Sequence, residues 1–172
     1  RTVTIVDTTP PAITCAPDEL LECGQQYQFT APTTSDECSV VTLDSIDFVI
    51  DGICSYGYGR TWIASDACGN TSTCSQTIMF EDTTPPTVSN PPTDVTVECG
   101  QPIPAYIPLW SDLCSSVTES AISSLAFDGC VETQSYTYSA TDECGNTASV
   151  SRTVTIVDTT PPSITCAPDE LL

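Results

Sequence analysis

The sequence predicts an all-β protein made of tandem immunoglobulin-like β-sandwich domains that are stapled by disulfide bonds. Eleven cysteines stand among its 172 residues. Short segments rich in Val, Ile, Thr and Tyr alternate with Gly, Pro, Asp and Asn, a pattern typical of short strands joined by turns. In addition, the first 21 residues recur almost unchanged at the end of the chain, which indicates a repeat architecture.

The repeat has two levels. Residues 1–21 and 152–172 differ only at Ala12 and Ser163, at a spacing of 151 positions. Between them lie weaker copies at spacings of 75 and 76, such as the run Asp-Thr-Thr-Pro-Pro and the run Asp-x-Cys-Gly-Asn-Thr. The chain therefore contains a unit of 75 to 76 residues that alternates between two types. A unit of this size is near the lower limit for a stable core, which explains why it needs disulfides.

The repeat boundaries predict four parts. We expect the last strand of a preceding repeat at 1–7, a first domain at 8–82, a second domain at 83–158 and the first strand of a following repeat at 159–172. Within the first domain, the candidate strands are 12–15, 19–22, 26–31, 40–50, 56–65 and 73–81.

Comparison of the two units predicts one disulfide bond. The positions that match Cys15 and Cys74 hold Asn90 and Val150. Both cysteines are absent together from the second unit, as expected if they are bonded. Cys166 then matches Cys15, and its partner is expected outside this sequence.

The other pairings depend on topology. In an immunoglobulin strand order, the loops carrying Cys38 and Cys68 lie at one end of the domain, and Cys23 and Cys54 lie at the opposite end. We therefore predict one bond within each end, and the same in the second unit: Cys23–Cys54, Cys38–Cys68, Cys99–Cys130 and Cys114–Cys144.

The composition excludes several classes of function. The net charge is −20, with three basic residues and no lysine, so nucleic acid is not expected as a partner. No apolar run is long enough for a membrane helix, so membrane insertion is not expected. The cysteine density indicates an oxidising, extracellular compartment, whereas the wide cysteine spacing and the absence of histidine argue against zinc. No carboxylate pair stands out as acid and base, so no catalytic residue and no enzymatic activity are predicted.

Three motifs together carry a family resemblance: Asp-Thr-Thr-Pro-Pro at Asp7–Pro11 and Asp82–Pro86, Glu-Cys-Gly at Glu22–Gly24 and Glu98–Gly100, and Asp-x-Cys-Gly-Asn-Thr at Asp66–Thr71 and Asp142–Thr147. The chain resembles the hyalin-repeat (HYR-like) immunoglobulin-like domains of secreted surface adhesins and filaments of Bacteroidota, including gliding-motility adhesins. The resemblance covers the whole chain, and it implies repeats without an active site.

The resemblance also implies O-glycosylation at Asp followed by Ser or Thr and then Thr or an aliphatic residue. The matching acceptors are Thr8, Thr83, Thr159 and Ser45. The same runs predict semi-rigid linkers, because proline fixes its own φ and makes the preceding residue extended. The linker prolines are Pro10, Pro11, Pro85, Pro86, Pro161 and Pro162. Asn70 begins an N-glycosylation sequon, but its place in the Asp-x-Cys-Gly-Asn run favours a loop-forming role.

Calcium is the one ligand that the acidic residues suggest, and no other cofactor is expected. In the predicted topology, each linker Asp enters the next domain beside two acidic loops, and Ca²⁺ prefers several carboxylate oxygens. The candidate ligands are Asp7, Asp36, Glu37 and Asp66 in the first unit, and Asp82, Asp112 and Asp142 in the second. The alternative is that these carboxylates only accept hydrogen bonds within tight loops.

We therefore predict an extracellular, cell-surface structural repeat: a rigid, disulfide-linked spacer whose partners are neighbouring repeats or identical chains in a fibre. One alternative is a ligand- or glycan-binding module, in which the stripe Tyr56, Tyr58 and Trp62, or the unit-specific Trp110, stacks on sugars. Such a stripe is more often core. The other alternative is a small subunit that polymerises by exchanging its terminal strand.

Overall fold

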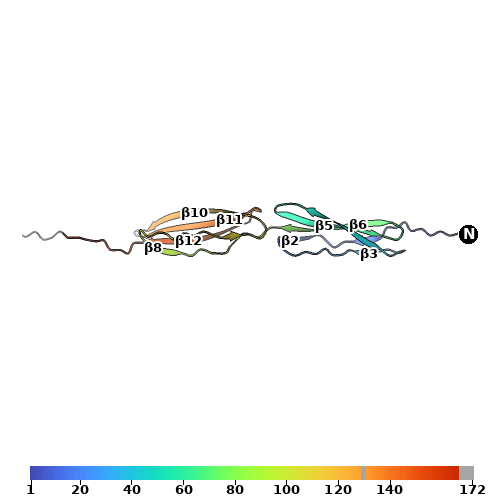
Figure 1. The fold of residues 1–172 in the computed structure, drawn as a ribbon, viewed down its shortest axis with the longest axis horizontal. Coiled ribbons are helices and arrows are strands. Elements are labelled where there is room, and N and C mark those ends of the chain that lie inside the picture. The colour runs from blue at the N-terminus through green and yellow to red at the C-terminus, as the bar shows by residue number, and fades with distance from the viewer. Residues whose placement is uncertain (129–130, 167–172) are drawn as a thin grey trace, which may run out of the picture.

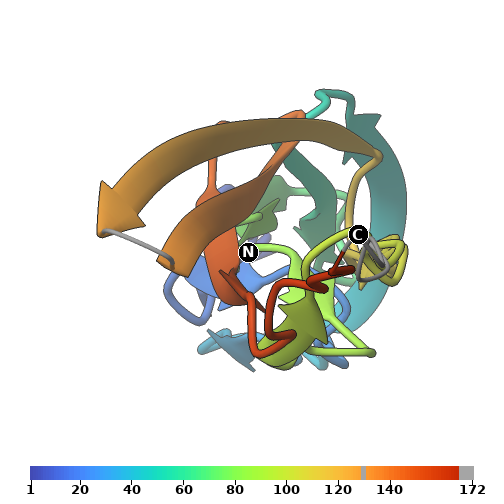
Figure 2. The ribbon, with the colours of Figure 1, turned by 90° about the vertical axis from the view of Figure 1, so that its left-hand side faces the viewer.

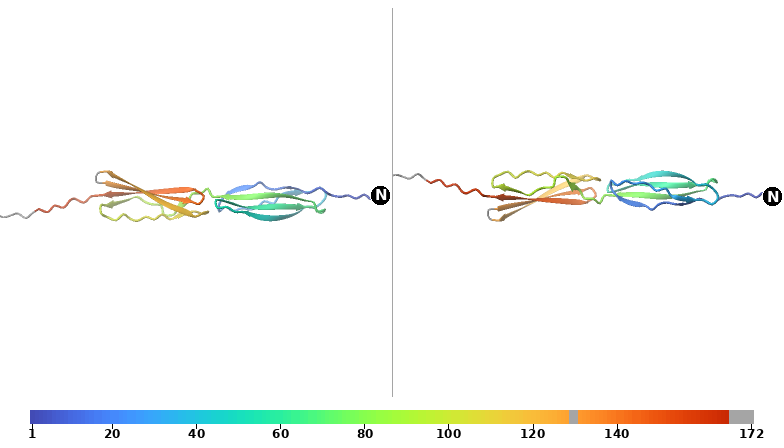
Figure 3. Two further views of the ribbon diagram at one scale, coloured as in Figure 1. Left: turned by 90° about the horizontal axis from the view of Figure 1, so that it is seen from above. Right: turned by 90° about the horizontal axis from the view of Figure 1, so that it is seen from below.

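The computed structural model describes residues 1–128 and 131–166. These residues form β-strands and no helix, and none of their segments is a helix long and apolar enough to cross a membrane. Figure 1 shows two β-sandwich units placed end to end, with the N- and C-terminal segments extending along the same axis on opposite sides. The two views of Figure 3 show the same end-to-end arrangement. The predicted all-β sandwich class is confirmed.

The first unit is a four-stranded sheet facing a two-stranded one. The order of the larger sheet is β2-β6-β5-β4, with β2 parallel to β6 and the other pairs antiparallel, and the smaller sheet pairs β1 with β3. The strands are β1 (Ala12–Thr14), β2 (Glu19–Glu22), β3 (Thr33–Ser35), β4 (Thr42–Ile50), β5 (Ser55–Ser65) and β6 (Thr71–Glu81).

The second unit repeats this topology strand for strand. Its larger sheet has the order β10-β11-β12-β8, with β8 parallel to β12, and its smaller sheet pairs β7 with β9. The strands are β7 (Thr87–Val88), β8 (Val95–Glu98), β9 (Trp110–Ser111), β10 (Val117–Asp128), β11 (Val131–Asp142) and β12 (Thr147–Val157). In the view along the long axis, the two units lie one behind the other (Figure 2).

Each unit has a very small core, and two buried positions are common to both. Ala64 and Ile78 are fully buried in the first unit, and Ala140 and Val154 occupy the same places 76 positions later. Phe80 completes the first core. Because each core buries so few side chains, covalent bonds must supply part of the stability.

One predicted strand is absent and another takes its place. Residues 26–31 are not a strand, whereas β3 begins at Thr33. The backbone N–H of Thr30 donates instead to the side-chain Oε1 of the buried Gln76 (3.1 Å), whose Nε2 donates to the carbonyl of Pro17 (3.1 Å). The segment is therefore held by a side chain rather than by a neighbouring strand.

Residues 1–7 also form no strand. We predicted this segment as the last strand of a preceding repeat. That strand would need the sheet of that repeat to pair with, and residues 1–7 alone do not supply one. Residues 159–166 are likewise outside any strand, and 167–172, which the same prediction included, lie outside the described residues.

Candidate functional site

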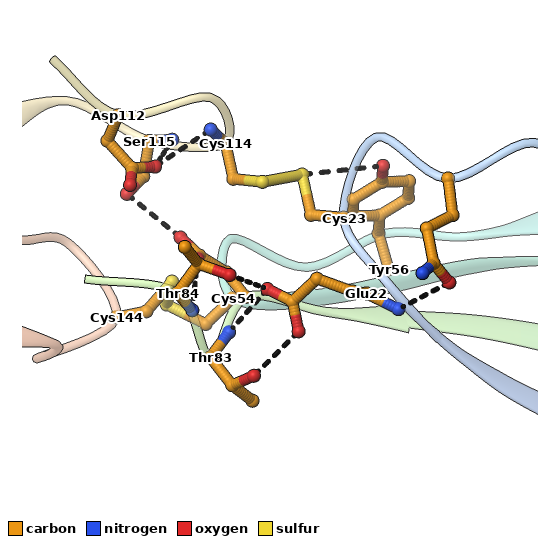
Figure 4. The surroundings of a disulfide bond; sticks show 12 residues. Glu22, Cys23, Cys54, Tyr56, Thr83, Thr84, Asp112, Cys114, Ser115 and Cys144 are labelled. Atoms are coloured by element: carbon orange, nitrogen blue, oxygen red, sulfur yellow. Dashed lines mark hydrogen bonds between the residues drawn. A yellow bond between two sulfur atoms is a disulfide. The ribbon is translucent and has the colours of Figure 1, made fainter. Parts of the chain in front are cut away.

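The junction between the two units is the most elaborate feature of the molecule. Two disulfide bonds cross it: Cys23 is bonded to Cys114, and Cys54 is bonded to Cys144. Their Cα–Cα distances are 6.0 and 5.2 Å, which lie in the usual range for disulfides. Figure 4 shows both bonds beside the linker, so that consecutive units are joined by three covalent connections.

These bonds correct two predicted pairings. Cys23–Cys54 and Cys114–Cys144 were wrong, because each of these cysteines is bonded across the junction. The predicted placement at the two ends of a unit holds: Cys23 and Cys54 lie beside the outgoing linker, where the Cys23 N–H donates to the Glu81 carbonyl (2.9 Å). The pairing failed because end-to-end stacking places two cysteines of one unit against two of the next.

The other predicted bonds have different outcomes. Cys15 is bonded to Cys74, with Cα atoms 5.8 Å apart. Cys38 and Cys68 are exposed and not bonded to each other or to any other described cysteine, which contradicts the predicted Cys38–Cys68 bond. The predicted Cys99–Cys130 bond involves Cys130, which lies outside the described residues.

In the second unit, a hydrogen-bonded asparagine stands at the position of Cys15. Asn90, at the position of Cys15, donates from Nδ2 to the carbonyl of Ile107 (2.9 Å) and accepts at Oδ1 from the N–H of Leu109 (2.7 Å). The asparagine therefore ties the start of this unit to the segment that leads into β9.

Glu22 holds the linker from the side of the first unit. Its carboxylate accepts from the N–H and the hydroxyl of Thr83 (2.9 and 2.6 Å) and from the hydroxyl of Thr84 (2.9 Å). Glu98 makes the same set of bonds with Thr159 and Thr160 after the second unit. The two glutamates therefore fix the linker threonines, and the prolines that follow in the chain add rigidity because their φ is fixed.

The second unit holds the linker through Asn146. Its Nδ2 donates to the carbonyl of Asp82 (3.0 Å) and to Oδ2 of Asp142 (2.9 Å), while Asp142 Oδ1 accepts from the N–H groups of Cys144 and Asn146. Gly145 has a φ of +87°, which only glycine adopts readily. The Asp-x-Cys-Gly-Asn run is thus a loop that presents its cysteine and clamps the linker.

The equivalent loop of the first unit is built the same way. Asn70 donates to the carbonyl of Asp7 (3.2 Å) and to Asp66 (2.7 Å), and Gly69 has a φ of +88°. This confirms the loop-forming interpretation of Asn70. Because its amide is committed to these two bonds, the structure does not favour glycosylation at the sequon.

Sequence reasoning missed the linker anchors Glu22, Glu98, Asn70 and Asn146. A signal was available, because each of the four stands directly in a motif that recurs in both units, next to or near a junction cysteine. What the sequence did not show is that the hydrogen-bond partners are the threonines and the Asp carbonyl of the linker.

Hydrogen bonds lower the pKa of Glu22. The hydroxyl of Thr83 contributes most, followed by the Thr83 N–H and the Thr84 hydroxyl, and desolvation opposes them. Since the folded pKa lies below the usual 4.5, the stabilisation is present above that value and is lost as the pH falls through the folded pKa. The pKa of Glu98 is lowered by the corresponding bonds from Thr159.

We predict that acid releases the linker from Glu22. Below pH 4.5, the amide resonance of Thr83 is expected to move with a midpoint below the usual pKa of glutamate. In Glu22→Gln the movement should be absent, while the Thr159 amide, which bonds Glu98, should still titrate and serves as the internal control. A Thr83 titration that persists in Glu22→Gln would contradict this account.

The predicted calcium ligands gather in part. Asp7, Asp36 and Asp66 each offer an oxygen within 4.8 Å of the others, whereas Glu37 does not join this group. In the second unit, Asp82 approaches Asp112 in one group and Asp142 in another, and the cysteine sulfurs in these groups are already in disulfides. Most of these carboxylates already accept hydrogen bonds; for example, Asp82 accepts from the Ser115 hydroxyl (3.1 Å).

The aromatic stripe packs into the first unit. Tyr58 stacks on Tyr27 with ring centroids 4.9 Å apart, and Tyr56 stacks on Phe80 at 5.1 Å. Trp62 lies under the Arg60 guanidinium at 5.3 Å. The stripe therefore builds the core side of β5, and Trp110, in β9, is itself only partly exposed.

Together, the fold and the junction define a class: tandem β-sandwich repeats locked end to end by disulfides, of the kind found in extended proteins of oxidising compartments. Residues 87–156 match the family model described as a HYR-like domain with 4 cysteines. The second unit is therefore similar to HYR-like, hyalin-repeat domains.

The chain is also similar to known proteins along most of its length. Hyalin of the sea urchin Strongylocentrotus purpuratus is 35% identical over 185 residues, covering 98% of this chain; the chain spans 15% of that protein. Among solved structures, Drosophila N-cadherin EC1-4 (12% identity, 88% of this chain, 50% of that chain) and protocadherin gammaB4 (13% identity, 89% and 35%) each give a TM-score of 0.39.

Proposed function

We propose that this chain is a segment of a secreted bacterial surface adhesin or filament, in which HYR-like repeats act as a rigid, non-enzymatic spacer. The observation that carries the proposal is the pair of disulfides across the junction, Cys23–Cys114 and Cys54–Cys144. Two separate covalent bonds beside a short linker restrict both bending and rotation, which a spacer requires and an independent binding module does not.

The chemistry of the surface supports the same role. With a net charge of −20, the two units repel each other. Within the described residues, the ion pair between Arg60 and Asp47 lies inside the first unit, and no salt bridge crosses the junction. Covalent bonds and uncharged hydrogen-bond donors therefore hold the units together. The bacterial source is supported by the resemblance of the three motifs to Bacteroidota adhesins.

The lectin alternative is less well supported, because Tyr56 and Tyr58 stack on other aromatic rings of their own unit. Strand exchange would use the exposed residues at the start of the chain, where Val3 and Ile5 are 80% and 91% exposed. The intact mass of the native polypeptide on a reducing gel after deglycosylation separates these proposals. A chain of many repeats supports the spacer; a chain of this length alone overturns it in favour of exchange.

Glycans on the linker would alter the junction. The hydroxyl of Thr83 donates to Glu22 and that of Thr159 donates to Glu98, and a glycan at either oxygen would remove the donor. Thr8 is exposed and Ser45 partly exposed. We therefore propose that glycans, if attached, occupy Thr8 and Ser45 before Thr83 and Thr159, an order that glycopeptide mass spectrometry would reveal.

We further propose that Asp7, Asp36 and Asp66 bind calcium, because Oδ2 of Asp7 is buried without a hydrogen-bond partner among the described residues. Calcium is expected to raise the melting temperature and EDTA to reverse it; at about 100 times Kd the gain is about 2.7 kcal/mol. Asp36→Asn should reduce the gain, and the exposed Asp44→Asn should not. Equal melting curves with calcium and with EDTA would rule out this site.

A further inference from the structure

Three unbonded cysteines occupy junction positions. Within the described residues, Cys38, Cys68 and Cys99 are exposed and have no disulfide partner. Cys38 and Cys68 stand 76 positions before Cys114 and Cys144, and Cys99 stands 76 positions after Cys23. All three counterparts are bonded across the described junction. The unpaired cysteines are therefore the matching halves of further junctions.

The end of the first unit that carries Cys38 and Cys68 is already shaped like the described junction. Asn70 holds the Asp7 carbonyl (3.2 Å) as Asn146 holds that of Asp82 (3.0 Å). The two cysteine loops are tied together, because the N–H of Ala67 donates to the hydroxyl of Ser39 (3.1 Å). The incoming linker and the loops that carry both thiols thus adopt the arrangement of a junction although no preceding unit is present.

The opposite end of the molecule is shaped in the complementary way. The N–H of Cys99 donates to the Val157 carbonyl (2.8 Å), as that of Cys23 donates to Glu81 (2.9 Å), and Glu98 holds the outgoing linker. A Cβ at Gly24 would lie 2.6 Å from the Leu113 side chain across the junction, whereas one at Gly100 would meet nothing within 4 Å. The space that the next unit fills at Gly24 is therefore open at Gly100.

The sequence indicates which of the two repeat types fits each end of the molecule. The segment that precedes the first unit, Arg1–Pro11, is identical to Arg152–Pro162, which closes the second unit. Cys166 stands where the first unit has Cys15. A second-type repeat thus matches the Cys38 end, and a first-type repeat matches the Cys99 end.

We propose that Cys38 and Cys68 bond to the counterparts of Cys23 and Cys54 in a second-type repeat, and that Cys99 bonds to the counterpart of Cys38 in a first-type repeat. Every junction of the array is then doubly cross-linked in the same pairing, and the disulfides form a continuous ladder. This rests on the proposed function, because it requires repeats stacked end to end.

The bonds form by thiol–disulfide exchange. Two cysteine thiols lose two protons and two electrons as the S–S bond forms, and an oxidising disulfide, of a small molecule or of a thiol oxidoreductase, takes them up and becomes two thiols.

The test is disulfide mapping of the full native chain. The chain is alkylated in guanidinium without reduction and digested at acidic residues, because three arginines and no lysine give trypsin few sites. The expected product joins the Cys38 peptide to a peptide that carries the cysteine of a Glu-Cys-Gly motif in another repeat. A Cys38–Cys68 peptide or an alkylated Cys38 would overturn the proposal.

Two further measurements distinguish a failure of the proposed pairing from a failure of the proposed function. In Cys38→Ser, the Glu-Cys-Gly cysteine of the preceding repeat should become alkylated, while Cys15–Cys74 should stay bonded as the control. Gels with and without reductant show whether the partner repeat belongs to the same chain or to a second copy. If the native chain is long but Cys38 is bonded to Cys68, the disulfide ladder is ruled out and the proposed function stands. If the chain is short and Cys38 is bonded to a second copy, the long array is ruled out and the pairing stands.

Discussion

Replacing all four junction cysteines, Cys23, Cys54, Cys114 and Cys144, with serine is expected to release the two units from one orientation. The bonds close segments of 91 and 90 residues, and the chain-entropy model gives about 4–5 kcal/mol for each such loop. The linker, held by hydrogen bonds such as those of Glu22 and Asn146, would then act as a hinge. Small-angle scattering should show a broad distribution of lengths in place of one extended form.

The matched control is the double change of Cys15 and Cys74 to serine. This bond spans 59 residues within the first unit, so its loss should lower the urea midpoint of that unit and leave the scattering profile extended. If the four-serine chain keeps a single extended form, hydrogen bonds and proline stiffness alone set the geometry, and the disulfides are not what makes the spacer rigid.

Ile78→Ala is expected to cost about 2–5 kcal/mol, the usual range for truncating a buried aliphatic side chain. Ile78 is a fully buried residue of β6, and a core with so few members has little else to compensate. Urea unfolding followed by tyrosine fluorescence should show the first unit unfolding at lower denaturant while the second keeps its midpoint.

Val154→Ala offers the equivalent change in the second unit, since Val154 is as buried as Ile78. Its effect should be smaller, because fewer methyl groups are lost. Ile122→Ala is the surface control: this side chain of β10 is 72% exposed, so little change is expected. A loss below about 1 kcal/mol for Ile78→Ala would mean that the disulfides, not the core, set the stability of the unit.

The fold was predictable because its signals are local. Alternating β-formers and turn residues gave five of the six strands of the first unit, and the internal repeat showed the spacing of the units. The exception, 26–31, has the composition of a strand, but its backbone is bonded by the side chain of Gln76, which is distant in sequence. No local pattern predicts such a contact.

The junction was only half predictable. The loss of Cys15 and Cys74 together from the second unit identifies their bond, because a missing pair leaves a trace in the sequence. No comparable trace exists for Cys23 and Cys54, since every unit keeps both ends of its junctions. Their positions at one end were correctly inferred, but the choice between a bond within that end and bonds to the next unit depends on how the units stack.

The three connections across the junction have a consequence for survival outside the cell. If a protease cuts the linker between Thr83 and Pro86, the units stay attached through Cys23–Cys114 and Cys54–Cys144. A single nick therefore leaves the array in one piece, and separating two units there requires two reduction events as well as the cut. A cut that would separate domains joined only by a peptide linker leaves these two units attached.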